Sequence, residues 1–333
     1  MNIRFSRRAF LQTASLATVA MVLPIASHSG QAAQVMQPSP QLRNPGFYRF
    51  KLGDFELVSV SDGTLSVPAA VFAGNASPNQ LAEVLQAGFE TETLTAHCNV
   101  LYVNTGQHRV LIDTGNGALS GDTAGKLLAN LQAAQINPSD IDTIIISHAH
   151  GDHVGGLLDA SGNSVFTNAQ FYVPRLEHEF WMQPQVSLPK MSLDEAAKQK
   201  MIETAKRQLG AIESRLTIFE PEQEIISGFS AMPASGHTPG QVAIRIRSGN
   251  QFLTHTADVV HTHHINLWHP DWQPIFDADP AQAVEARQRI LQQISDSREL
   301  MYAYHFPFPG LGHIRPREGG GFTWEPVNWQ FET

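Results

Sequence analysis

Cysteine is nearly absent from this sequence, and so are long apolar runs beyond its first thirty residues. Cys98 is the only cysteine among 333 residues, so no disulfide can form within the chain. It adjoins the apolar run 99–103, which favours a packed core thiol. Past residue 30, no stretch approaches the ~20 apolar residues that a membrane-spanning helix requires. We therefore expect a body that does not cross a membrane and owes its stability to core burial rather than to crosslinks.

Basic residues are also scarce. The chain has 22 lysines and arginines against 31 acidic residues, a formal net charge of −9. Residues 1–33 contain three arginines and no acidic residue, so the charge without them is −12. A body this acidic is a poor partner for nucleic acid or for an anionic membrane surface. We expect a small molecule as its partner.

The N-terminus has the features of an export signal. Arg4, Arg7 and Arg8 precede an apolar stretch over residues 9–26, and small residues follow. Residues 6–11 resemble the twin-arginine signal. We predict a signal peptide over residues 1–33 and a periplasmic or secreted protein, with an ordinary secretory signal as the alternative. Residues 34–45 are expected to be a flexible lead-in, and residues 46–333 a single domain.

Short strands and helices alternate from residue 46 onward, which is typical of the α/β class. Alternating apolar residues predict strands over 47–52 and 55–60, the second ending at a turn over 61–63. Capping signals predict three helices: from Ser77 to about 86, from a capping box at 192–195 to about 209 with Gly210 as its stop, and from Asp279 onward. Leucines on one side predict a further helix over about 123–135.

A weak repeat relates two stretches of the chain. Residues 99–103, a turn, residues 110–112 and Asp113 form the order strand, turn, strand, aspartate. Residues 242–246, a turn, residues 252–254 and Asp258 repeat it. The pattern is consistent with two similar halves facing each other across a cleft, although hairpins are common enough for chance to produce it.

The reactive side chains are concentrated after one apolar strand. Residues 141–147 predict a buried strand, and directly after it stand His148, His150, Asp152 and His153. Three imidazoles and a carboxylate are costly to bury together unless they bind something. They suit zinc, and also manganese, cobalt or iron. A solvated histidine-rich turn is the alternative, which the preceding strand and the following glycines disfavour.

The order His-x-His-x-Asp-His after an apolar strand resembles the signature of the metallo-β-lactamase-fold hydrolases. Further similarities follow in the family's order along residues 46–333: Asp113-Thr114-Gly115, the segment 235–240 with His237, Asp258 at a strand end, and His305 after residues 301–304. The resemblance implies an α/β fold of four layers, the αββα sandwich of that family.

The same resemblance implies two divalent metal ions, with zinc expected and manganese, cobalt or iron as alternatives. His148, His150 and His237 would hold one ion, Asp152, His153 and His305 the other, and Asp258 would bridge them. Asp258 and Asp152 are the expected catalytic residues, and Asp113 is expected to orient a ligand. Two cations ~4 Å apart acidify a bridging water, which supplies a hydroxide nucleophile at neutral pH.

Within that family, the chain resembles methyl parathion hydrolase and related lactonases. The similarity rests on residues 46–49, 52–56, 61–64, 308–315 and 325–328. This branch implies export and a homodimer. We therefore expect a hydrolase that opens lactones or cleaves aryl esters and also acts on organophosphate triesters. A dedicated phosphotriesterase and a non-catalytic metal-binding protein are the alternatives.

Aromatic and histidine side chains are candidates for the substrate pocket. We expect Trp181, His261, Trp268 and Phe276 to line it, although large aromatics also serve as core or interface residues. Four histidines follow Asp258 closely: His261, His263, His264 and His269. They are compatible with a third metal site or with a polar loop beside the pocket. We prefer the loop, because the seven ligands are already assigned.

Overall fold

The structure, a computed structural model, describes residues 44–119 and 121–331. The stretch Asn44–Thr333 forms one compact unit. The predicted signal peptide, residues 1–33, lies outside the described residues, as does the predicted lead-in up to residue 43. Within the described ranges, no helix is both long enough and apolar enough to span a bilayer.

The N-terminal half forms a seven-stranded sheet in which the strands follow chain order. Neighbouring strands are antiparallel from β1 to β4 and parallel from β4 to β7. The strands are β1 (Phe47–Leu52), β2 (Phe55–Pro68), β3 (Thr93–Asn104), β4 (Arg109–Ile112), β5 (Thr143–Ile145), β6 (Gln170–Pro174) and β7 (Leu216–Phe219).

The C-terminal half forms a second seven-stranded sheet, also in chain order. Its neighbouring strands are antiparallel except for β11 and β12, which are parallel. The strands are β8 (Glu224–Ile226), β9 (Phe229–Pro233), β10 (Val242–Ser248), β11 (Gln251–His255), β12 (Leu300–Tyr302), β13 (Leu311–Pro316) and β14 (Phe322–Pro326).

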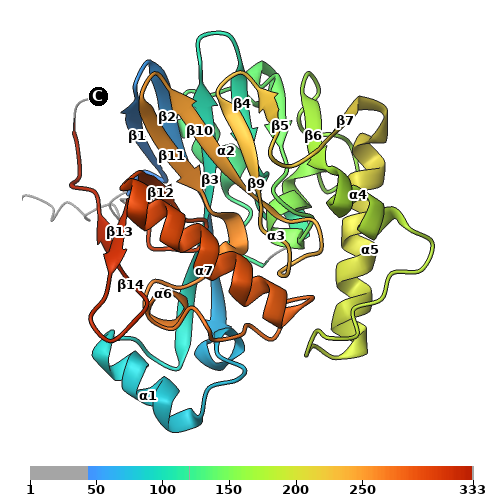
Figure 1. Cartoon of the computed structure of the whole chain (residues 1–333). Helices are drawn as coiled ribbons and strands as arrows, with labels where there is room; N and C mark the ends of the chain where they lie inside the picture. Colours follow the sequence, from blue (N-terminus) through green and yellow to red (C-terminus); the bar gives the residue numbers. More distant parts are fainter. Residues whose placement is uncertain (1–43, 120, 332–333) are drawn as a thin grey trace, which may run out of the picture. The chain divides into compact units, whose positions relative to one another are not determined.

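The two sheets pack face to face, and helices cover their outer faces (Figure 1). Buried residues of both sheets form the central core, among them Leu101 and Ile112 from one and Phe229 and Ile244 from the other. The helices are α1 (Pro78–Ala87), α2 (Leu127–Ala133), α3 (Gly151–Val154), α4 (Arg175–Met182), α5 (Glu195–Ile212), α6 (Ile265–Trp268) and α7 (Pro280–Ser297).

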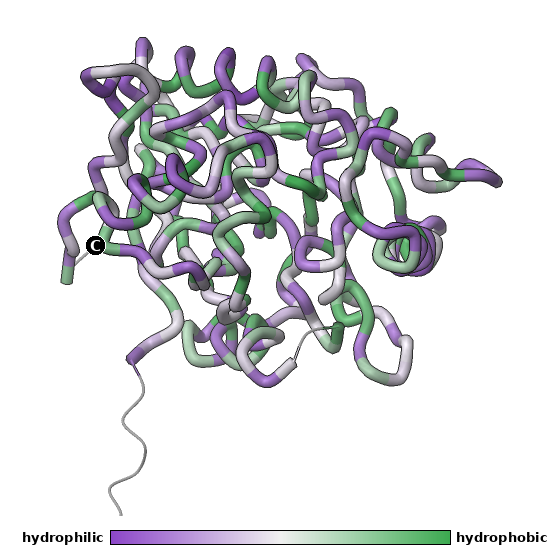
Figure 2. Tube along the Cα trace, turned by 90° about the horizontal axis from the view of Figure 1, so that it is seen from below, coloured by the Kyte–Doolittle hydropathy of each residue, from purple (hydrophilic) through white to green (hydrophobic). Residues whose placement is uncertain are grey.

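Helices α2, α4 and α5 bury apolar side chains against the N-terminal sheet, and α7 does so against the C-terminal sheet. Figure 2 shows that the outermost turns of the described trace are mostly hydrophilic, as expected when each helix buries one face. The α/β class and the four-layer αββα sandwich predicted from the sequence are therefore confirmed. Cys98 is fully buried in the core beneath α2, where burial raises the pKa of its thiol.

Several predicted elements differ from the observed ones at their ends. The turn expected at 61–63 is a bulge inside the longer strand β2, where the register shifts between Ser61 and Thr64. The buried Asp62 carboxylate explains the irregularity, because it accepts hydrogen bonds from the backbone N–H groups of Asn116, Gly125 and Leu127. These bonds also hold residues 123–126 in a turn, so α2 begins later than predicted.

Helix α5 differs at both of its ends. Asp194, not Ser192, caps it by accepting a hydrogen bond from Ala197 N–H. The helix continues through Gly210 to Ile212, whose side chain is fully buried in the core against the N-terminal sheet. Burial of that side chain is worth ~2 kcal/mol and offsets the poor helix propensity of glycine. Helix α1, capped by Ser77, and helix α7, capped by Asp279, begin where the sequence predicts.

Candidate metal centre

The reactive side chains come from strand ends of both sheets. His148, His150, Asp152 and His153 occupy the loop after β5 and the first turns of α3. This loop packs tightly against the Asp113-Thr114-Gly115 segment after β4. Thr114 N–H donates to His153 O at 2.7 Å, and a Cβ at Gly156 would lie 2.0 Å from Thr114 O. Only glycine allows this close approach.

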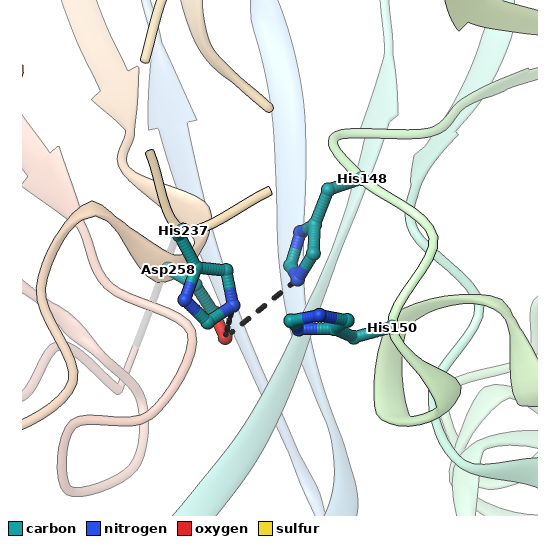
Figure 3. A group of neighbouring side chains, drawn as sticks. All are labelled: His148, His150, His237 and Asp258. Carbon is teal, nitrogen blue, oxygen red and sulfur yellow. Dashed lines mark ion pairs between the residues drawn. The ribbon is translucent and has the colours of Figure 1, made fainter. Parts of the chain in front are cut away.

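One group of ligand-type atoms consists of His148, His150, His237 and Asp258. Asp258 Oδ2 lies 3.7 Å from His148 Nε2 and 3.2 Å from His237 Nε2. Figure 3 shows His148 and His150 approaching from one side, and His237 and Asp258 from the other. The group therefore joins the two halves of the chain.

The second group consists of Asp152, His153, His305 and the same Asp258. Asp258 uses its other oxygen here, since Oδ1 lies 3.0 Å from His153 Nε2 and 3.3 Å from His305 Nε2. Asp152 Oδ2 lies 3.4 Å from His305 Nε2. The seven predicted residues thus come together in the two groups that the resemblance implied, with Asp258 common to both.

Buried, unpartnered atoms test whether these groups fit metal ions. The Nε2 atoms of His148, His150, His153 and His237 are all buried, and none has a partner in hydrogen-bond geometry among the described residues, although Asp258 oxygens lie 3.0 to 3.7 Å from three of them. Such atoms are costly unless a ligand satisfies them. Imidazole nitrogens and carboxylate oxygens are the donors that zinc and similar divalent ions prefer. The residues fit two divalent ions.

The electrostatics of the two groups favour added positive charge. Burial, together with the neighbouring imidazoles, holds the pKa of His148 and of His150 well below its usual range. Burial alone would lower the pKa of His153, but the carboxylates of Asp258, Asp152 and Asp113 outweigh it and raise that pKa well above its usual range. The cluster of carboxylates thus attracts a cation, which divalent ions would supply.

Each of three ligand-type histidines is oriented through its other ring nitrogen. His153 Nδ1 lies 2.8 Å from Asp113 Oδ2, and His305 Nδ1 lies 2.8 Å from His97 O. His237 Nδ1 lies 2.8 Å from Asp277 Oδ1. These contacts turn each Nε2 toward the centre. Asp113, predicted to orient a ligand, faces His153 and lies in neither group.

Two of the supporting acids were not predicted from the sequence. Asp277 is fully buried beside the buried Arg287, 3.6 Å away. Glu177 on α4 is also fully buried. No local pattern marks either residue, because the contacts that define them join segments far apart in the chain. Glu177 stands among other polar residues of α4, such as His178 and Glu179, so its sequence surroundings gave no signal of its role.

Glu177 connects the two loops that carry the first group. Its Oε1 accepts hydrogen bonds from Ala149 N–H and Trp181 Nε1–H, at 2.8 and 2.7 Å. Its Oε2 accepts from Thr238 Oγ1–H and Gly240 N–H, at 2.6 and 3.0 Å. Burial raises the pKa of Glu177, and these four hydrogen bonds oppose that shift. One carboxylate therefore holds the His148–His150 loop against the His237 loop.

A cavity of about 440 Å³ opens onto the first group. His150, Asp152, His237 and Asp258 lie on its polar side. Its apolar wall comes from five segments of the chain and includes Leu65, Leu119, Leu193, Met201 and Phe276. The cavity can therefore take a ligand with one polar and one apolar end.

The structure separates the four residues expected to line the substrate pocket. Phe276 lines the cavity, and His261 lies beside the centre with Nε2 3.2 Å from Asp258 Oδ2. Trp181 instead belongs to the core, fully buried, with its indole N–H donated to Glu177. Trp268 stands apart from the cavity wall and packs against His264 and Arg317. The prediction for the two tryptophans is corrected accordingly.

His261 is an additional buried imidazole at the centre. Both of its ring nitrogens are buried, with no hydrogen-bond partner in the described part of the chain. Its ring lies between Phe72 and Phe276, at centroid distances of 5.6 and 5.0 Å. Burial lowers the pKa of His261 to about 4 against the opposing effect of Asp258. A neutral imidazole is therefore available to a ligand in the site.

Known proteins share both the sequence pattern and the fold. The model of the metallo-beta-lactamase superfamily matches residues 95–305. An N-acyl homoserine lactonase of Bacillus thuringiensis is 24% identical over 178 residues, which cover 53% of this chain and 60% of that protein. The chain therefore spans about 60% of the length of these curated relatives.

Two solved structures are similar along almost their whole length. AidC, a dizinc quorum-quenching lactonase in complex with a product, has a TM-score of 0.82 and 32% identity, covering 86% of this chain and 98% of AidC. AbOPH, a hydrolase in the beta-lactamase superfamily, has a TM-score of 0.81 and 27% identity, covering 87% of this chain and 100% of AbOPH. The family resemblance read from the motifs is confirmed, and this chain belongs to the metallo-beta-lactamase superfamily.

Proposed function

We propose that this metal-dependent hydrolase opens the ring of N-acyl homoserine lactones and related lactones, and cleaves aryl esters more slowly. The observation that carries the proposal is a double ligand group at one side of a cavity whose other walls are mostly apolar, with Asn116, Lys200 and Thr204 as the polar exceptions. An N-acyl homoserine lactone has the matching division, a polar ring and amide joined to an apolar chain. The lactonases among the relatives support the same substrate class.

The residues suggest a division of roles. His148, His150 and His237 would hold one ion, which we propose to be zinc, and Asp152, His153 and His305 the other. Asp258 would contact both, since its two oxygens face different groups. When bound, two divalent ions lower the pKa of a water between them and polarise the substrate carbonyl. His261 offers a neutral ring nitrogen to the lactone or amide, and the apolar wall orients the acyl chain.

A substrate panel on zinc-reconstituted protein tests this proposal. Butanoyl, hexanoyl, octanoyl and decanoyl homoserine lactones should be compared with an aryl acetate and an organophosphate triester. Each buried methylene contributes ~0.8 kcal/mol, so kcat/KM should rise roughly fourfold per methylene until the apolar wall is filled. A flat dependence on chain length would contradict binding of the acyl chain in this cavity.

A pair of variants locates the effect. Leu193→Ala removes part of the cavity wall and should reduce kcat/KM for decanoyl more than for butanoyl lactone. Leu176→Ala is the matched control, because Leu176 is half exposed on α4 and does not line the cavity. Equal losses on both substrates, or an effect of the control, would count against the assignment of this wall.

The same panel distinguishes the two alternative functions, a dedicated phosphotriesterase and a non-catalytic metal-binding protein. A triester that is hydrolysed with the highest kcat/KM would identify a dedicated phosphotriesterase. Protein that holds two ions and hydrolyses none of the substrates would support a metal-binding role. The seven ligand-type residues lie at one side of the cavity, and the rest of the cavity can hold a substrate. This arrangement favours a catalytic role over metal binding alone.

Export and dimerisation are further proposals for the whole protein. Replacement of Arg7 and Arg8 by lysine should leave precursor in the cytoplasm if the twin-arginine route is used. Unchanged delivery to the periplasm would identify the general secretory route instead. Light scattering on the purified mature protein would test the homodimer.

A further inference from the structure

A third group of ligand-type side chains lies apart from the centre. Glu90 stands between α1 and β3, and His263 and His264 stand between Asp258 and α6. The histidines after Asp258 therefore have three different environments. His261 lies beside Asp258 at the centre. His269 stacks on Trp272, with ring centroids 4.2 Å apart. His263 and His264 both face Glu90.

The spacing of this third group matches that of a metal site. Glu90 Oε1 lies 3.4 Å from His264 Nδ1 and 4.0 Å from His263 Nε2. Tetrahedral bonds of ~2.1 Å to one ion place ligand atoms ~3.4 Å apart. In the two central groups, the corresponding distances from Asp258 and Asp152 to imidazoles run from 3.0 to 3.7 Å. A shift of about 0.6 Å at His263 would bring its distance from Glu90 to the same value.

The surroundings of the histidines also favour a cation ligand over a simple ion pair with Glu90. Burial, with neighbouring imidazoles, lowers the pKa of His263 to about 3, and burial lowers that of His264. Both rings are therefore neutral at neutral pH and available as ligands. His264 Nδ1 is buried, and its contact with Glu90 Oε1 at 3.4 Å lies outside hydrogen-bond geometry. The centroids of the two imidazole rings lie 3.9 Å apart.

In place of the polar loop preferred from the sequence for these histidines, we propose that Glu90, His263 and His264 bind a third divalent cation of the zinc type. Two imidazole nitrogens and one carboxylate form a ligand set that suits such an ion and leave one position for water or a small anion. A cavity of about 260 Å³ adjoins the group, and Glu90, His263, His261 and His305 all line it. The third ion would tie the α1–β3 connection to the loop after Asp258, next to the centre.

The number of zinc ions bound by the full mature chain tests the proposal. The protein is equilibrated by dialysis against a zinc buffer, and its metal content is measured together with its circular dichroism. Wild type should bind three ions per chain. Glu90→Gln and His264→Ala should bind two and keep both the wild-type spectrum and hydrolytic activity, because neither residue belongs to the central groups.

Two matched variants control for the substitutions themselves. Glu92→Gln changes an exposed glutamate two residues further on, and His269→Ala removes a histidine of the same segment outside the group. Both should keep three ions. Cobalt titration gives a second readout, since the visible absorption of the third equivalent should be missing in Glu90→Gln.

The outcomes separate this site from the proposed function, because ion counting needs no substrate. Two ions in wild type, three ions in every variant, or loss of more than one ion in Glu90→Gln would each overturn the third site. An enzyme inactive on lactones that still binds three ions would overturn only the proposed substrate.

Discussion

The two halves of this molecule build the metal centre in different ways. The N-terminal half contributes four residues within six positions, all in the loop after β5 and the start of α3. The C-terminal half contributes His237, Asp258 and His305, which follow three different strands. Ligands that are adjacent in the chain form a motif that can be recognised in the sequence. Ligands that follow separate strands become neighbours only through the order of the strands in the sheet.

The comparison is closest at the two aspartates of the predicted repeat. Asp113 follows β4, and Asp258 follows β11 after a short turn. In both halves, the strand before the aspartate pairs antiparallel with its predecessor and parallel with its successor. The equivalent positions serve different purposes: Asp258 faces the imidazole Nε2 atoms, whereas Asp113 faces His153 Nδ1. The same strand order thus places a buried aspartate in each half, and the imidazole nitrogen that it faces distinguishes a ligand-type residue from an orienting one.

The largest effect is expected when the C-terminal aspartate is removed. Asp258→Ala should reduce kcat/KM by roughly a thousandfold, ~4 kcal/mol, because a group common to both ion sites disappears. Elemental analysis should find fewer ions per chain than in the wild type measured alongside. Retention of both central ions with near-normal activity would show that Asp258 does not link the groups.

The next effect concerns the residue that joins the loops of the two halves. Glu177→Gln replaces an acceptor-only carboxylate with a group that can accept at one atom only. The four buried donors that Glu177 now satisfies would then share one acceptor oxygen. The free energy of unfolding should therefore fall by ~3 kcal/mol, and zinc affinity should weaken. Denaturant unfolding and zinc titration measure the two changes. The control is Glu179→Gln, whose carboxylate is more than half exposed on the same helix.

Loss of the N-terminal aspartate should be milder than loss of its C-terminal counterpart. Asp113→Asn keeps the shape of the side chain but removes the charge beside His153 Nδ1. Mutation of a residue that orients a ligating histidine typically lowers metal affinity by about 10- to 100-fold. Competition with a chelator measures this affinity, with the exposed Asp142→Asn as control. An effect as large as that of Asp258→Ala would mean that the two positions are not used differently.

Local motifs in a fixed order carried the resemblance to the family, and that resemblance implied the four layers and the ligands at the strand ends. The residues that support the ligands could not be predicted, because their contacts join segments far apart in the sequence. Glu177 touches segments 28 and 61 to 63 positions away, and Asp277 meets a histidine 40 positions away. Trp181 was misplaced for the same reason. An aromatic near a motif can face the cavity or the core, and only packing decides between them.

The residue three positions after the aspartate also differs between the halves: it is Asn116 in the N-terminal half and His261 in the C-terminal half. His261 follows Asp258 by three residues, and its buried ring lies between two phenylalanine rings with Nε2 3.2 Å from Asp258 Oδ2. A flat lactone can stack there and accept a hydrogen bond. A tetrahedral triester with three spreading substituents is better served by a wider and more apolar wall.

His261→Leu should therefore shift the ratio of lactone to triester kcat/KM toward the triester by about tenfold, ~1.4 kcal/mol of differential transition-state binding. The two substrates are measured side by side on protein of equal metal content, so that a change in ion occupancy cannot imitate a change in preference. His269→Leu serves as control, because that ring stacks on Trp272 away from the centre. A ratio unmoved by His261→Leu, or a wild type already faster on the triester, would remove His261 as the residue that selects the substrate.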